Sequence, residues 1–186
     1  TQQAAMAIRN SALLIEIKEQ ERYKRELEIA RSVQERLLPD TFPDISGLEF
    51  NAICQSAYEV GGDYYDYFVL DKHRIGIAIA DVTGKGTSAA FYMAELKGMM
   101  TFLAQEMDSP KELLCRLNTH LSGNVDKRIF VTMIYGILNT LTGEFTFVRA
   151  GHNALIVQRH ARDDNPDVYI PPGIGLGLTN DMIFFD

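Results

Sequence analysis

Hydrophobic positions divide the chain into a long helical segment and a globular part. Residues 3–38 contain neither Gly nor Pro and are rich in good helix formers, which predicts one long helix that ends at Pro39. Its apolar residues recur at intervals of three and four, in two stripes that are out of step with each other. The first stripe is Ala5, Ile8, Ala12 and Ile15, and the second is Tyr23, Leu27, Ala30 and Leu37. The shift between them is typical of a stutter in a coiled coil.

This first helix predicts a linker that forms dimers. A helix of about 35 residues is about 50 Å long at 1.5 Å per residue, which is too long to pack entirely on a small domain. We therefore interpret residues 1–38 as a dimerising helical linker, and a helix packed on its own domain is the alternative. Because the chain begins without Met, we expect it to be part of a longer protein.

The remaining residues, 39–186, predict an α+β domain. Alternating apolar residues over 48–56 predict a half-buried strand, and 64–70 and 74–80 predict two more strands joined by a turn at 71–73. A helix capped by Thr87 or Ser88 is expected to run to about Met107. A second helix, with Ser109 as its cap and Pro110 in its first turn, is expected to run to about Leu121.

Further strands are expected after the two helices, over 129–138, 144–150 and 154–159. A polar loop over 160–167 and an irregular Gly/Pro segment over 170–177 complete the pattern. Runs of strands on both sides of a helix pair predict antiparallel sheet rather than βαβ repeats.

Charge and composition narrow the classes of function. The net charge of −7 argues against nucleic acid as the main partner. Residues 1–38 carry seven basic and six acidic residues, whereas the rest carries eleven and nineteen, so the globular part alone has a charge of −8. No apolar run reaches the roughly 18 residues of a membrane span, and there is no signal-peptide pattern. Two cysteines make no disulfide framework, so we expect a reducing, cytoplasmic setting.

Candidate chemistry lies in two acidic turns, 60–66 (VGGDYYD) and 80–86 (ADVTGKG). Each places a carboxylate beside glycines at the end or edge of a predicted strand, and the leading carboxylates are Asp63 and Asp81. Carboxylates with backbone carbonyls are hard oxygen ligands that select Mg²⁺ or Mn²⁺. Two such ions can activate a water and hold a phosphate during an in-line displacement. An Asp before a Gly-rich turn is also common in ordinary loops, so it is the pairing that favours a metal site.

These turns, together with 150–153 (AGHN) and the lead-in 26–39 (ELEIARSVQERLLP), resemble the metal-dependent protein phosphatases of the PPM (PP2C-like) class. The resemblance is to the bacterial branch of SpoIIE and RsbU type and covers roughly residues 26–180. It implies an αββα sandwich, in which two antiparallel sheets are flanked by helices. It also implies hydrolysis of phosphoserine or phosphothreonine by a water bridging two Mn²⁺ or Mg²⁺ ions, with a phosphorylated STAS-type anti-sigma-factor antagonist as substrate.

The resemblance assigns roles to individual residues. Asp81 matches a bridging metal ligand, Val82 the position that offers a backbone carbonyl, and Asp63 an acidic residue that binds metal directly or through its waters. Asp66 and Gly62 are expected to support these ligands. For His152 two roles stay open, since it could order its turn by hydrogen bonds or act as a general acid.

Two departures and one further likeness qualify the resemblance. Ala154 stands where the family usually has Pro, and no Ser/Thr–Asp–Gly motif follows Leu178. Asp181 and Asp186 lack the flanking glycine, so we expect a C-terminally truncated catalytic domain with an incomplete metal site. Residues 3–13 resemble the closing helix of a GAF sensor domain, with an unrelated linker as the alternative.

Competing functions remain at this stage. A Gly–Gly–Asp tripeptide also resembles diguanylate cyclases, but those have Glu–Phe next, where this chain has Tyr64–Tyr65. The first glycine of a P-loop is missing, and neither Cys54 nor Cys115 has an Arg six residues later, as cysteine phosphatases need. The non-enzyme alternative is a catalytically inactive dimeric module that binds a signalling partner.

Overall fold

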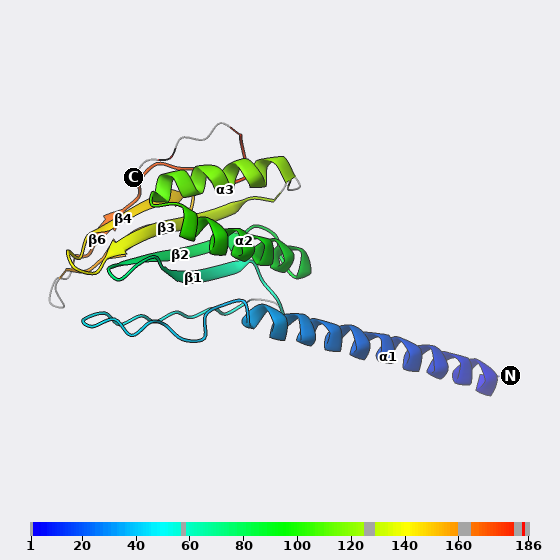
Figure 1. Ribbon diagram of the computed structural model, residues 1–186. Coiled ribbons are helices and arrows are strands. Elements are labelled where there is room, and N and C mark those ends of the chain that lie inside the picture. Colours follow the sequence, from blue (N-terminus) through cyan, green and yellow to red (C-terminus); the bar gives the residue numbers. More distant parts are fainter. Residues whose placement is uncertain (1, 57–58, 125–128, 160–164, 181–183, 185–186) are drawn as a thin grey trace.

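A long helix leads into an antiparallel sheet that two helices cover on one face (Figure 1). The structure is a computed structural model that describes residues 2–56, 59–124, 129–159, 165–180 and 184. The elements run in the order α1 (Gln2–Glu35), β1 (Asp63–Val69), β2 (Arg74–Val82), α2 (Thr87–Glu106), α3 (Pro110–Asn124), β3 (Val131–Asn139), β4 (Phe145–Ala150), β5 (Leu155–Val157) and β6 (Asp167–Tyr169). Strands β1–β4 form one sheet in sequence order, and β5 and β6 form a second, two-stranded sheet. The α+β class with antiparallel sheets is therefore confirmed.

The core lies between the four-stranded sheet and the helices α2 and α3. Along β1 and β2 side chains alternate between the two faces, as the period of two requires. Tyr64, Phe68, Ala78 and Ala80 are buried towards the helices. The helices meet them with a row of buried apolar residues that comprises Ala89, Met93, Leu96, Met100, Leu113, Leu114 and Leu117. The opposite face of the sheet is more open, and Ile79 on it is 49% exposed.

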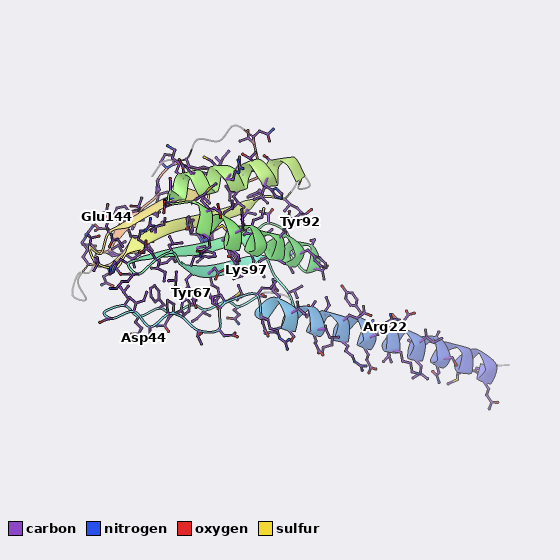
Figure 2. The ribbon with its side chains drawn as sticks, in the orientation of Figure 1. Arg22, Asp44, Tyr67, Tyr92, Lys97 and Glu144 are labelled. Carbon is purple, nitrogen blue, oxygen red and sulfur yellow. The ribbon has the colours of Figure 1, made fainter. Side chains whose placement is uncertain are left out.

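Helix α1 projects away from the sheet for most of its length (Figure 1). Arg22 marks this projecting part (Figure 2), and the apolar residues Ile15 and Tyr23 within it are exposed. Only the last turns pack on the domain, where Ala30, Val33 and Leu37 border an apolar groove against α2. The alternative of a helix packed along its own domain is therefore wrong for the greater part of α1.

The strand expected over 48–56 is not formed. These residues make no ladder, and Ile53 is 94% exposed. Alternation indicates which side chains share a face, but a strand also needs a neighbouring backbone to bond its N–H and C=O groups. Aromatic contacts hold the segment instead, since the Phe42 ring stacks on Phe50 at 5.9 Å and on Tyr65 at 6.3 Å between centroids.

Two other details differ from the sequence prediction. Gly86, at φ 69°, caps α2 in place of Thr87 or Ser88. Neither of these residues makes a side-chain cap bond, because they are the first two residues of the helix itself. Asp167, expected at the end of a polar loop, forms β6 together with the next two residues and pairs with β5. By contrast the Ser109 cap is confirmed, because its Oγ accepts a hydrogen bond from the Glu112 N–H at 3.3 Å.

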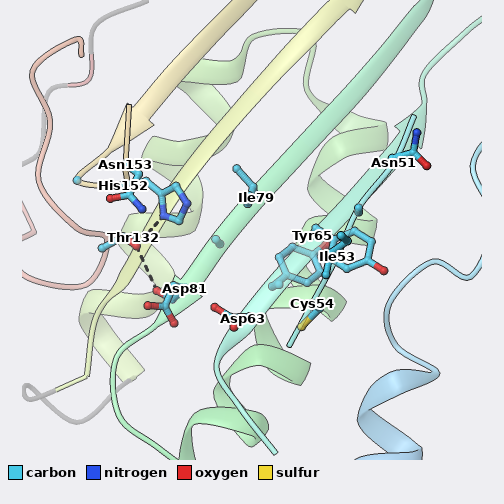
Figure 3. Close-up of a pocket in the computed structure, with 14 residues that line it drawn as sticks. Asn51, Ile53, Cys54, Asp63, Tyr65, Ile79, Asp81, Thr132, His152 and Asn153 are labelled. Atoms are coloured by element: carbon cyan, nitrogen blue, oxygen red, sulfur yellow. Dashed lines mark hydrogen bonds between the residues drawn. The ribbon is translucent and has the colours of Figure 1, made fainter. Parts of the chain in front are cut away.

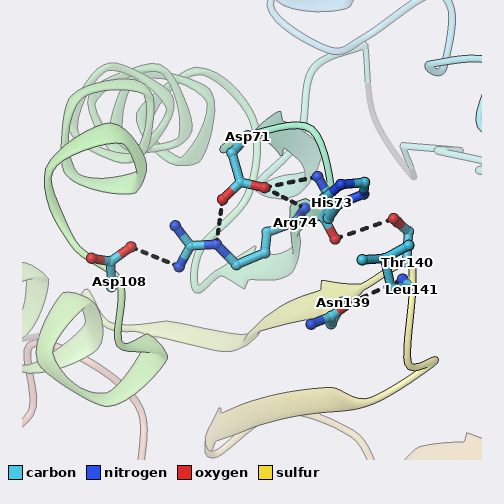
Figure 4. A network of polar contacts seen from close by, with 7 residues as sticks. All are labelled: Asp71, His73, Arg74, Asp108, Asn139, Thr140 and Leu141. Carbon is cyan, nitrogen blue, oxygen red and sulfur yellow. Dashed lines mark hydrogen bonds and ion pairs between the residues drawn. The ribbon is translucent and has the colours of Figure 1, made fainter.

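The end of the sheet remote from the acidic turns is fastened by Arg74 (Figure 4). Its guanidinium donates to Asp71 at 2.6 Å and to Asp108 at 2.7 Å, which joins the β1–β2 turn to the α2–α3 turn. The His73 carbonyl accepts from the Thr140 N–H at 2.8 Å, which joins the same turn to the β3–β4 hairpin. This network joins the loops at one end of the sheet. The strand ends that carry the acidic residues lie at the opposite end.

Candidate metal centre

Strand pairing places the two leading carboxylates directly opposite each other. Asp63 of β1 is the register partner of Asp81 of β2, and Asp81 is in turn the partner of Thr132 of β3. Directly opposed residues in antiparallel strands have Cβ atoms about 4.5–5.5 Å apart. All three lie on the more open face of the sheet (Figure 3). The two acidic turns, 18 residues apart in sequence, thus form one carboxylate pair.

Electrostatics make this pair receptive to a cation. The pKa of Asp81 is raised, first by partial burial and then by the negative charge of Asp63. Two carboxylates that face each other repel, and an added positive charge between them removes that repulsion. A divalent cation is therefore the kind of ligand that this arrangement favours.

Gly62 allows the turn before β1 to lie against the end of β2. The Val82 N–H donates to the Gly62 carbonyl at 3.2 Å. A Cβ atom on Gly62 would lie only 2.2 Å from the Val82 carbonyl oxygen, so no larger residue fits without separating the two backbones. Glycine at this position lets the Val82 carbonyl lie against Gly62, the residue before Asp63.

His152 joins the row from the next turn of the chain. Gly151, at φ 65°, forms a bridge to Met133, and the His152 Nδ1 lies 2.8 Å from the Thr132 hydroxyl. The Thr132 hydroxyl also contacts the Asp81 carbonyl at 3.4 Å. Burial lowers the pKa of His152, partly offset by the charge of Asp81, so the ring is neutral at pH 7.

Arg149 fixes the turn that carries His152. Its Nε donates to the His152 carbonyl at 2.5 Å, and its Nη1 donates to the Pro171 carbonyl at 3.1 Å. The hydrogen bonds of the His152 ring and backbone therefore order this turn, and the ring still lies beside the carboxylate pair (Figure 3).

The row borders an open cleft of about 670 Å³. Its remaining walls come from the irregular segment before β1, including Asn51, Ile53 and Cys54, and from Asn153 after β4. The pKa of the Cys54 thiol is raised, first by burial and then by the charge of Asp63. Sequence reasoning did not anticipate Thr132 or Cys54 here, and only the strand register could have placed Thr132 beside Asp81.

Asp66 lies apart from the carboxylate pair. It is three residues after Asp63, so the strand turns its side chain to the opposite face, where it is 5% exposed. There it accepts hydrogen bonds from Lys97 and Tyr64. The structure brings together Asp63, Asp81, Gly62, Val82 and His152, but it does not place the Asp66 carboxylate among them.

A second contact missed from the sequence joins α1 to this centre. The Gln34 side chain donates from Nε2 to the Gly61 carbonyl at 2.6 Å and accepts from the Gly61 N–H at 3.1 Å. Gln34 is buried, and it follows Tyr23, Leu27 and Ala30 in the second stripe of the helix. A polar residue on an apolar stripe is the signal that could have revealed it.

The set of donor atoms around the carboxylate pair is small but of the kind that binds hard divalent cations. Asp63 and Asp81 offer carboxylate oxygens and Val82 a carbonyl, all hard donors of the type that Mg²⁺ and Mn²⁺ take. Within the described ranges, no group of three or more His, Cys, Asp or Glu side chains is placed to hold one ion. The Asp181 and Asp186 positions lie outside the described residues.

Comparison with solved structures identifies the class of fold. The PP2C phosphatase domain of SpoIIE from Bacillus subtilis matches with a TM-score of 0.57 at 20% identity, over 67% of this chain and 36% of that chain. RsbX, solved in complex with magnesium, matches with a TM-score of 0.53 at 18% identity, over 68% and 58%. The fold is that of PP2C-type phosphatases.

Sequence comparison gives the family within that class. The family model of Stage II sporulation protein E (SpoIIE) matches residues 71–185, which is more than half of the chain. The chain therefore belongs to the SpoIIE family. It is 42% identical over 163 residues to the phosphoserine phosphatase RsbU of Bacillus subtilis, over 87% of this chain and 48% of that protein. The chain thus spans about half the length of this curated relative.

Proposed function

We propose that this protein is a metal-dependent protein serine/threonine phosphatase of a bacterial signalling pathway. The observation that carries the proposal is the pairing of Asp63 with Asp81 across β1 and β2, on the open face of a PP2C-type fold. The similarity to a phosphoserine phosphatase supports the choice of substrate chemistry. The diguanylate cyclase alternative explains neither the pairing nor the family match.

In this proposal the carboxylate pair holds Mn²⁺ or Mg²⁺, with two ions expected. Asp81 and Asp63 would supply carboxylate oxygens, Asp63 directly or through water, and Val82 would supply its backbone carbonyl oxygen. When bound, such ions lower the pKa of a coordinated water and offset the charge of a phosphoryl group. The globular part has a charge of −8, so phosphate capture by a basic cleft is a poorer explanation.

His152 contributes from beside the pair. Its neutral ring is oriented through Nδ1 by Thr132, and this leaves Nε2 as the second polar atom of the ring. Ordering of the turn is the role best supported by the bonds of Arg149 to it. A role as general acid would require the ring to be protonated, which its lowered pKa opposes at pH 7.

Regulation is proposed to enter through α1. The Gln34 side chain forms hydrogen bonds with both the N–H and the carbonyl of Gly61, which is two residues before Asp63. A rotation of α1 therefore acts directly on the turn that precedes a proposed metal ligand. The exposed apolar residues along α1 support dimerisation through this helix, which Ile15→Asp should abolish. An unchanged mass in analytical ultracentrifugation would remove the dimer from the proposal.

The proposed partner is a phosphorylated protein of the STAS-type anti-sigma-factor antagonist class. This follows from the family resemblance, and no side chain in the described cleft selects one phosphoprotein over another. No nucleic acid or membrane partner is proposed. Among the described residues, no helix combines the length and apolar character needed to cross a bilayer.

The test is phosphate release by the full-length protein from a phosphoserine protein substrate as MnCl₂ is titrated. We expect Mn²⁺-dependent hydrolysis that falls at least about 100-fold on Asp81→Asn, because one ligand of the ion is lost. Asp108→Asn is the matched control, since Asp108 is an exposed carboxylate at the other end of the sheet. Full activity of Asp81→Asn would refute the proposal. Absence of hydrolysis by the full-length protein, with intact dimers, would instead favour the inactive partner-binding module.

A further inference from the structure

A buried ion pair joins β1 to α2 on the face of the sheet away from the cleft. Asp66 Oδ2 accepts hydrogen bonds from Lys97 Nζ at 2.5 Å and from the Tyr64 hydroxyl at 2.7 Å. Asp66 Oδ1 accepts from the Tyr67 N–H at 2.9 Å. The Asp66 side chain is 4% exposed and that of Lys97 27% exposed. Three donors thus satisfy one carboxylate, and Lys97 is the donor that comes from another element (Figure 2).

The ion pair fixes the position of α2 on the sheet more closely than the apolar packing does. The buried face of α2 consists mainly of small or flexible side chains, namely Ala89, Met93, Leu96, Met100 and Ala104. Methionine adapts to several arrangements and alanine offers little surface to interlock, so these residues hold the helix on the sheet without strongly fixing its position along its own axis. In the described part of the chain, the other ion pair from α2 to a neighbouring element is Glu95 with His120 of α3, at 3.5 Å and partly exposed.

Asp66 and Asp63 belong to the same edge strand. Among the described residues, β1 has a hydrogen-bonded neighbouring strand on one side only, which is β2. Just before Asp63 the chain is held by the hydrogen bond between Val82 and Gly62 and by the contact of Gln34 with Gly61. A shift or twist of β1 relative to β2 would therefore change how the Asp63 carboxylate faces Asp81. An anchor at Asp66, three residues away, resists that movement from the helical side of the sheet.

We propose that Lys97 and Asp66 are positioning residues for the metal centre: their ion pair holds edge strand β1 against α2 and so keeps Asp63 opposite Asp81. This inference rests on the proposed function, because it assumes that the carboxylate pair binds a divalent cation. The ion pair is a second connection from the helices to Asp63, beside the Gln34–Gly61 contact. Helix α2 also borders the apolar groove against α1, through Ala90, Phe91 and Ala94. A displacement of α2 would then weaken cation binding without touching a ligand.

A positioning role can be separated from a purely stabilising one. A buried ion pair often contributes little net stability compared with an uncharged pair of similar shape, whereas removal of one partner alone is strongly destabilising. The double variant Asp66→Asn/Lys97→Met removes both charges and retains similar volumes. We therefore expect it to unfold at a temperature close to that of the unmodified protein, while Lys97→Met alone unfolds at a lower temperature.

The decisive experiment is calorimetric titration with MnCl₂, combined with amide hydrogen exchange without metal. For the double variant we expect the Mn²⁺ dissociation constant to rise at least about fivefold, at the low end of the range for couplings between sites. We also expect faster exchange in β1 than in the unmodified protein, with exchange in β3 unchanged. Glu95→Gln is the matched control on α2 and should leave both quantities unchanged.

The outcomes distinguish this inference from the proposed function. If the unmodified protein binds no Mn²⁺, the proposed function fails. If the unmodified protein and the double variant bind Mn²⁺ equally and exchange equally in β1, the positioning role is refuted and the proposed function stands. Should the double variant not fold, Lys97→Arg decides, because it keeps the charge but changes the length and shape of the head group. It should weaken Mn²⁺ binding, and unchanged affinity would overturn the inference.

Discussion

Replacement of Gly62 by alanine tests how closely the two acidic turns must approach. The added Cβ would lie 2.2 Å from the Val82 carbonyl oxygen and 3.1 Å from the Val82 carbonyl carbon. Ordinary van der Waals contact begins at about 3.4 Å. The start of β1 and the end of β2 must therefore separate by about 1 Å, and the Val82–Gly62 hydrogen bond of 3.2 Å lengthens with them.

The size of the effect follows from two terms. Overpacking of a rigid contact costs about 1–3 kcal/mol, and loss of one backbone hydrogen bond about 0.5–1.5 kcal/mol. We expect Gly62→Ala to lower the free energy of unfolding by about 1.5–4.5 kcal/mol, which corresponds to roughly 3–18 °C in Tm for a domain of this size. Because Asp63 is the next residue, the same separation moves a proposed metal ligand away from Asp81.

Thermal unfolding with and without MnCl₂ measures both consequences. The unmodified protein should gain about 2.7 kcal/mol at a Mn²⁺ concentration 100 times the Kd. Gly62→Ala should lose most of this gain. Gly98→Ala is the matched control, because Gly98 lies within α2 with open space around it. It should be more stable by up to about 1 kcal/mol and keep the full Mn²⁺ effect. If Gly62→Ala equals the unmodified protein in Tm and in Mn²⁺ response, the close approach does not matter as argued.

Three further changes test other parts of the site. Gln34→Leu removes both bonds to Gly61 and keeps the stripe apolar, so the Mn²⁺-dependent rise in Tm should shrink; an unchanged rise would contradict the link to α1. Because the pKa of Asp81 is raised, the contribution of this carboxyl group to stability falls as the pH rises through that pKa. At pH 7 and without metal, Asp81→Asn should therefore be more stable than the unmodified protein by about 0.2–1 kcal/mol. A lower Tm for Asp81→Asn would contradict this. Because the pKa of His152 is lowered, the contribution of its neutral ring to stability is present above about pH 6.5 and is lost as the pH falls. In urea unfolding between about pH 7.5 and 5, His152→Gln should therefore lose less stability than the unmodified protein. An equal loss of stability in the two proteins would contradict this.

The elements that could be predicted from the sequence were those with strong local signals. Strands β1 and β2, the helix pair and the Ser109 cap were expected from periodicity and capping residues, and each formed close to its expected bounds. Asp63 and Asp81 were expected to act as a pair, although no register was derived for them from the sequence. The short turn between their strands fixes that register, since a hairpin with a known turn sets which residues face each other.

What could not be predicted depends on contacts between distant segments. Residues 48–56 alternate like a strand but have no ladder partner in the described structure, and periodicity carries no information on partners. Gln34 contacts Gly61 across 27 positions of sequence, and Lys97 contacts Asp66 across 31. The face on which Asp66 lies could have been predicted, because a residue three positions after Asp63 in a strand points the other way.

The central claim is that Asp63 and Asp81 hold a divalent metal ion together. Calorimetric titration of the purified protein with MnCl₂, alongside Asp63→Asn and Asp81→Asn, measures this most directly. The account predicts binding by the unmodified protein that is lost or severely weakened in both variants, because each removes one carboxylate of the pair. Equal Mn²⁺ affinity in all three proteins would contradict it.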